Sequence, residues 1–185
     1  MKKFSSILLV LISLITTLNM IDFPWEIRFV DPSSNYLFVM VLAVLIPIST
    51  FLWSAFREGT FNKVFSFIVS FCLLLPCYLV FTVAGLDYAD IRKEGVDSSF
   101  EEINKIQVNE NNYILYRTNG GATTSFGLVL RVEKEVTANL KVVNVIYSKY
   151  KASDSTLKLV DNEKIEMRIQ PYSKGGKVEV VTLSL

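Results

Sequence analysis

The segment VFSFIVSFCLLLPCYLVFTVAGL, Val64–Leu86, contains no charged residue, and the sequence after it turns polar and forms short alternating runs. A helix of that length reaches roughly 35 Å, which is enough to cross a hydrocarbon layer of about 30 Å. The sequence therefore predicts a membrane helix that connects an N-terminal membrane region to a soluble C-terminal domain.

Two further uncharged runs precede this segment, and together the three predict transmembrane helices at about residues 4–21, 36–56 and 64–86. A basic start followed by an apolar run is also typical of a secretory signal peptide. We expect the first helix to remain uncleaved, because its end, TTLNMID, offers no small-x-small cleavage site. The N-terminal region, residues 1–86, is thus predicted to be a multi-pass membrane region in contact with the lipid bilayer.

Basic residues flank these runs unevenly, with Lys2 and Lys3 before the first, Arg28 after it, and Arg57 and Lys63 between the second and third. The positive-inside rule then places the N-terminus in the cytoplasm and the C-terminal domain outside it, in a cell-membrane protein.

Pro47 and Pro76 lie near the middle of the second and third runs. A proline within a membrane helix removes a backbone hydrogen bond, so these positions mark either a broken-helix binding site or a packing kink. We favour the kink, because none of the three runs contains an ionisable side chain of the kind that bound ions or polar substrates require.

The composition argues against several functions. The chain has no histidine, which removes the commonest general base and metal ligand. Acidic and basic residues balance from Asp87 onward, so nucleic acid is excluded as an expected partner. We expect no cofactor, no metal and no enzymatic activity.

The C-terminal part is predicted to comprise a connector, residues 87–102, and a soluble β domain, residues 103–185. Within it, alternating or β-rich runs are separated by turn residues such as asparagine and glycine. The run at residues 140–147 is more continuously apolar than the preceding one and is typical of a central strand buried on both sides. Strands are expected at residues 103–108, 113–116, 124–132, 140–147, 156–160, 164–170 and 178–185. This spacing predicts a small antiparallel sandwich or barrel-like domain.

One turn in this domain is a candidate recognition loop, because consecutive glycine N–H groups can bind an anion and several hydroxyls follow them. It lacks the lysine and the helix of a phosphate-binding loop, so a plain hairpin is the favoured interpretation. Its residues are Asn119, Gly120, Gly121, Thr123, Thr124 and Ser125.

The run from Asn111 to Phe126, NNYILYRTNGGATTSF, resembles a pattern in uncharacterised small bacterial membrane-anchored proteins. In these proteins a strand enters a Gly-Ala-Thr-Thr turn and an alternating strand follows. The resemblance implies a bacterial origin and a β domain, and it carries no catalytic residue.

The acidic pairs Glu101–Glu102 and Glu133–Glu135 could serve acid/base chemistry or Ca²⁺ binding, but no Asp-x-Asp spacing supports this, and we interpret them as solvated strand ends. The leading hypothesis is a membrane protein that displays a β domain to an unidentified protein partner, for binding or scaffolding. The alternative is a membrane-bound immunity or regulatory subunit that acts through its helices.

Overall fold

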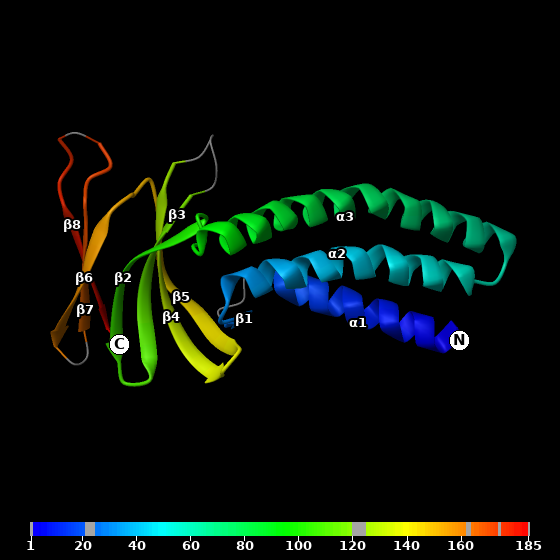
Figure 1. Cartoon of the computed structure of the whole chain (residues 1–185), viewed down its shortest axis with the longest axis horizontal. Coiled ribbons are helices and arrows are strands. Elements are labelled where there is room, and N and C mark those ends of the chain that lie inside the picture. Colours follow the sequence, from blue (N-terminus) through cyan, green and yellow to red (C-terminus); the bar gives the residue numbers. More distant parts are fainter. Residues whose placement is uncertain (1, 21–24, 120–124, 162–163, 174, 185) are drawn as a thin grey trace. The chain divides into compact units, whose positions relative to one another are not determined.

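The computed structural model describes residues 2–20, 25–119, 125–161, 164–173 and 175–184. The chain divides into two compact units (Figure 1). The helical unit comprises Met1–Phe23 and Asp31–Gly95, and the β unit comprises Pro24–Val30 and Val96–Leu185.

Three helices build the helical unit: α1 (Lys2–Met20), α2 (Pro32–Ala55) and α3 (Thr60–Glu94). They confirm the three predicted helices, but α3 continues for two turns beyond Leu86, through the first half of the expected connector. It ends at Gly95, which has a φ of 76° and donates its N–H to the Ile91 carbonyl at 2.8 Å. Glycine adopts this left-handed conformation without the steric cost that a Cβ imposes, so Gly95 terminates the helix.

Helices α2 and α3 lie side by side as a hairpin (Figure 1). The Ser54 and Ser70 hydroxyls are hydrogen-bonded across the interface at 3.0 Å, and the rings of Phe51 and Phe67 lie 6.1 Å apart. Hydroxyls of α2 also bond to the backbone beside Pro47: Thr50 Oγ1 donates to the Pro47 carbonyl at 2.9 Å. The choice between a packing kink and a broken-helix site at Pro47 stays a prediction.

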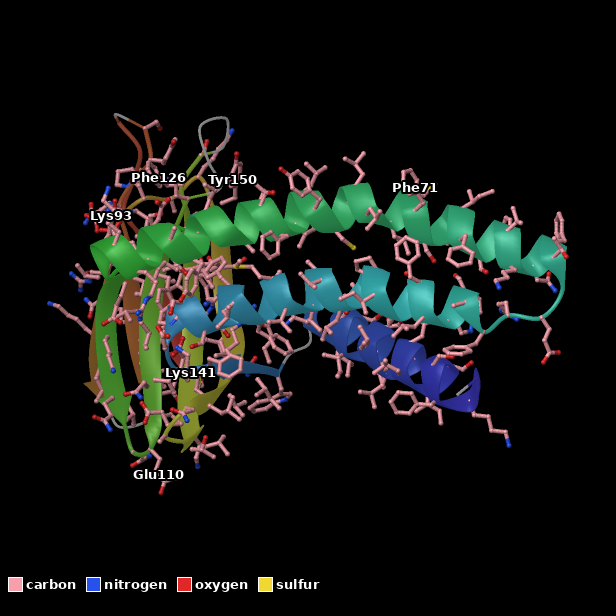
Figure 2. The ribbon with its side chains drawn as sticks, turned by 45° about the vertical axis from the view of Figure 1, so that its right-hand side comes forward. Phe71, Lys93, Glu110, Phe126, Lys141 and Tyr150 are labelled. Atoms are coloured by element: carbon pink, nitrogen blue, oxygen red, sulfur yellow. The ribbon has the colours of Figure 1, made fainter. Side chains whose placement is uncertain are left out.

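The burial pattern of this hairpin is unusual, because most of its buried side chains are small or hydroxylated, with Leu42 and Ile91 as large apolar exceptions, and many large apolar side chains are exposed. The buried residues are Ser33, Leu42, Ala43, Pro47, Ser49, Thr50 and Ser54 of α2 and Ser66, Ser70, Ala84 and Ile91 of α3. In contrast, Phe71 is 70% exposed and Leu75 is 66% exposed. Figure 2 shows large side chains standing out along α3, where Phe71 is labelled.

The β unit contains two antiparallel sheets (Figure 1). The first has the strand order β1-β5-β4-β3-β2, and the second has the order β6-β7-β8. The strands are β1 (Glu26–Phe29), β2 (Phe100–Val108), β3 (Asn111–Thr118), β4 (Gly127–Thr137), β5 (Leu140–Tyr150), β6 (Ser155–Asp161), β7 (Lys164–Ile169) and β8 (Glu179–Ser184). The predicted antiparallel β domain is therefore confirmed.

The two sheets share one apolar core. Alternation along β3 and β4 directs Leu115, Leu128 and Leu130 into it, and alternation along β7 does the same for Ile165 and Met167. All five side chains are completely buried. The core thus fixes one face of the five-stranded sheet against the three-stranded sheet and leaves the other face for different contacts.

Strand β1 was not predicted, because residues 22–35 read as a short loop between two helices. Glu26 to Phe29 instead pair antiparallel with Val143 to Leu140 of β5. The addition of β1 gives β5 a neighbour on both sides, as expected for a central strand. The expected burial of β5 on both faces is wrong, however, since Val143 is the one buried residue of this strand.

Candidate functional site

Charged and aromatic side chains gather on the face of the five-stranded sheet opposite the shared core. Register pairs Val143 with Glu133 on one side and with Glu26 on the other, and pairs Lys141 with Arg28. We call this cluster the polar sheet face, and its members are Glu26, Arg28, Phe100, Tyr116, Arg131, Glu133 and Lys141. Successive residues of a strand alternate between the two faces of a sheet. Leu128 and Leu130, which alternate with Arg131 and Glu133 along β4, therefore point into the shared core.

Glu133 lies at the centre of the polar sheet face and is only 4% exposed. The Tyr116 hydroxyl donates to its Oε1 at 2.9 Å, and the Lys141 ammonium donates to its Oε2 at 2.6 Å. Lys141, on β5, is labelled in Figure 2. A buried carboxylate requires such partners, because removal from water is costly unless the charge is paired and hydrogen-bonded.

Arg131 adds a second cationic group. Its guanidinium lies over the Phe100 ring, 4.1 Å from the centroid, and 5.2 Å from the centroid of the Tyr116 ring. Burial lowers the pKa of Arg131, and the nearby positive charge of Arg28 lowers it further. Its Nε is buried and has no hydrogen-bond partner within the described ranges. Cation–π stacking is therefore the contact that replaces water around this group.

Glu133 corrects the sequence interpretation of the acidic residues as solvated strand ends, since its carboxylate is buried and paired. Glu101 is paired as well, and accepts from Arg117 Nη2 at 2.5 Å across β2 and β3. The alternation of Val129, Arg131 and Glu133 with the core residues was the signal that could have identified the polar sheet face. Its polar members made that face look solvent-exposed.

The predicted recognition loop falls largely outside the described residues, which exclude Gly120, Gly121, Thr123 and Thr124. Asn119 donates its N–H to the Ser99 carbonyl at 3.2 Å, and the Ser125 N–H donates to the Tyr150 hydroxyl at 3.3 Å. These bonds connect the two ends of the loop to neighbouring segments of the β unit. The recognition role of the loop stays a prediction.

A polar hollow of about 440 Å³ opens at the end of β2 and β3. Its lining consists of Lys105, Gln107, Glu110, Asn112, Lys134 and Glu135. The ammonium of Lys134 donates to Glu110 at 2.7 Å across it. Small-molecule sites are mostly apolar with a few convergent polar groups, and this hollow lacks apolar lining residues. No group of three or more potential metal ligands occurs among the described residues.

Searches of protein-family models, curated proteins and solved structures find no match to this chain. The resemblance carried by residues 111–126 therefore stays a prediction.

The pH dependence of protein stability tests whether the Tyr116 hydroxyl is buried against Glu133. Burial, and then the negative charge of Glu133, raise its pKa above the usual 10.0. The unfolded chain therefore loses this proton first, so the contribution of Tyr116 to stability is present below pH 10.0 and is lost as the pH rises further. We expect the wild type to lose more unfolding free energy than Tyr116→Phe between about pH 9 and about pH 11. Denaturant titration at both pH values measures the difference.

The control for this experiment is Tyr172→Phe, at a residue that is 49% exposed. This variant should keep the pH dependence of the wild type. Identical pH dependence of the wild type and Tyr116→Phe would show that the Tyr116 hydroxyl is not buried against Glu133.

Proposed function

We propose that this protein is a membrane-anchored display protein. Helices α1, α2 and α3 cross the cell membrane, the N-terminus is cytoplasmic, and the β unit lies outside the cytoplasm, where it binds or scaffolds a protein partner. The proposed activity is binding and not catalysis, because the buried acid of the polar sheet face has both oxygens occupied by Tyr116 and Lys141.

The observation that carries this proposal is the reversed burial pattern of α2 and α3. Both helices are long and apolar enough to cross a membrane, and only 28% and 11% of their most apolar stretches are buried. The core helix of a water-soluble protein buries its large apolar side chains. Membrane helices associate through small and hydroxylated residues and present large apolar residues to lipid, which is the pattern of Ser54, Ser70 and Phe71.

The path of the chain supports the same topology. The chain leaves the β unit after Val30, passes through α2 and α3, and returns to the β unit at Val96. Two crossings bring a chain back to the side from which it started, so β1 and the other strands can share one compartment. With 24 and 35 residues, α2 and α3 reach roughly 36 and 52 Å, each enough for a hydrocarbon layer of about 30 Å.

The alternative, an immunity or regulatory subunit that acts through its helices, is favoured by the open surface of α3. Four of its 35 residues are buried. The side chains of Phe61 and Phe65 are both exposed, and their rings are stacked with centroids 6.5 Å apart. Such a surface suits either lipid or a helix of a membrane-embedded partner.

Reporter fusions test the proposed orientation. In a bacterial host, alkaline phosphatase fused after residue 185 is expected to be active, because that enzyme folds only outside the cytoplasm. A fluorescent protein fused at the same position is expected to be dark. The matched pair of fusions after Glu58, between α2 and α3, should give the opposite readouts. A fluorescent fusion after residue 185 together with an inactive phosphatase would refute extracytoplasmic display.

A further inference from the structure

Strand β1 has two chemically different faces. Glu26 and Arg28 belong to the polar sheet face, and Arg28 Nη2 lies 2.5 Å from Glu26 Oε2. Trp25 and Ile27 alternate with them, and these side chains are 67% and 73% exposed. A water-facing edge strand would carry charges rather than a tryptophan and an isoleucine on its free surface.

The apolar surface continues onto the neighbouring strands. Register pairs Ile27 with Val142 and Phe29 with Leu140, and Val136, which is 62% exposed, lies at a β-bulge opposite Leu140. The Val30 N–H also donates to the Asn139 carbonyl at 3.0 Å, which fixes the end of the β4–β5 hairpin beside β1. We call this surface the apolar edge. Its residues are Trp25, Ile27, Phe29, Val136, Leu140 and Val142.

Chain length restricts the position of the apolar edge. The strand begins six residues after α1 ends at Met20 and ends three residues before α2 starts at Pro32. At about 3.4 Å per residue, β1 can lie no farther than roughly 20 Å from the end of α1 and roughly 10 Å from the start of α2. A strand connected at both ends to membrane helices by such short segments must remain close to the membrane surface.

We propose that the apolar edge is immersed in the lipid headgroup layer and holds the β unit against the membrane surface. This inference rests on the proposed membrane insertion of α1 and α2. Tryptophan favours the headgroup region, since its ring is apolar and its N–H can still reach a polar partner. The neighbouring apolar side chains extend the surface that enters this layer.

The two tryptophans allow a direct test in the full-length protein, reconstituted in phosphatidylcholine vesicles. Trp53→Phe leaves Trp25 as the single tryptophan, and Trp25→Phe leaves Trp53 on α2. We expect Trp25 emission to be shifted to shorter wavelength, protected from iodide, and quenched more by lipids brominated near the headgroup than by lipids brominated deep in the acyl chain. A charge beside the ring, Ile27→Asp, should restore iodide quenching, whereas Val160→Asp at a comparably exposed position of β6 should not.

The outcomes separate this inference from the function on which it rests. If brominated lipid quenches the fluorescence of Trp53 while iodide quenches that of Trp25, the membrane contact of the apolar edge is refuted and the insertion of α2 stands. Protection of Trp25 from iodide without quenching by any brominated lipid would also refute it, and would indicate contact with a protein. If neither tryptophan is quenched by brominated lipid, the proposed membrane insertion fails as well.

Discussion

Glu133→Ala is expected to lower the free energy of unfolding of the β unit by about 3–5 kcal/mol, the usual cost of removing one partner from a buried ion pair. The substitution leaves the Lys141 ammonium, whose side chain is 17% exposed, without its carboxylate. It also leaves the Tyr116 hydroxyl without its acceptor. Denaturant unfolding of the purified protein in detergent, followed by circular dichroism, measures this loss.

Two variants show whether the loss comes from the buried pair. Glu110→Ala removes the ion pair between two exposed side chains, Glu110 and Lys134, so it should leave the free energy of unfolding unchanged within error. Glu133→Leu combined with Lys141→Met removes both charges and should be clearly more stable than Glu133→Ala, because no unpaired charge remains. Equal losses for Glu133→Ala and Glu110→Ala would contradict the buried network.

The strands of the β unit were largely predictable, because their turns have local chemical signals. Asn109 adopts a φ of 55° in the turn between β2 and β3, where the sequence NENN at residues 109–112 separates the two expected strands. Alternation of Ile165, Met167 and Ile169 identified the face of β7 that lies in the core. Such signals depend on neighbouring residues, and a sequence contains them directly.

Strand β1 could not be predicted for the opposite reason. Its four residues include Glu26 and Arg28, and its partner on β5 lies more than a hundred positions away in the chain. Only the pairing with β5 makes this segment a strand. The same pairing adds Glu26 and Arg28 to the polar sheet face and forms the apolar edge. The apolar edge was therefore beyond local sequence signals, whereas alternation along β4 already indicated the polar sheet face.

The end of α3 illustrates a different limit. Hydropathy marks Leu86 as the end of the apolar run, but the residues from Asp87 to Glu94 still favour a helix in water. The backbone continues until Gly95, and Arg92 and Lys93 stabilise the carbonyl end of the helix. The end of a membrane segment and the end of a helix are set by different physical properties, and the sequence indicated the first of them.

The second large effect is expected from charges on the outward face of α3. Phe71 and Leu75 are one helical turn apart, near the middle of the apolar run, and both are exposed. An arginine at the centre of a membrane helix costs about 2.5–3.5 kcal/mol, so Phe71→Arg with Leu75→Arg should oppose insertion by about 5–7 kcal/mol. The matched control, Phe71→Leu with Leu75→Phe, exchanges the same apolar side chains and should insert normally.

The central claim, that α2 and α3 face lipid, is tested most directly by the fraction of protein that stays with membranes after alkaline carbonate extraction. We expect the wild type and the apolar exchange to remain in the membrane pellet. The double arginine variant should be released into the supernatant or lost to degradation. Release of the wild type, with an equally abundant and soluble double arginine variant, would contradict a membrane hairpin and would place these helices in water.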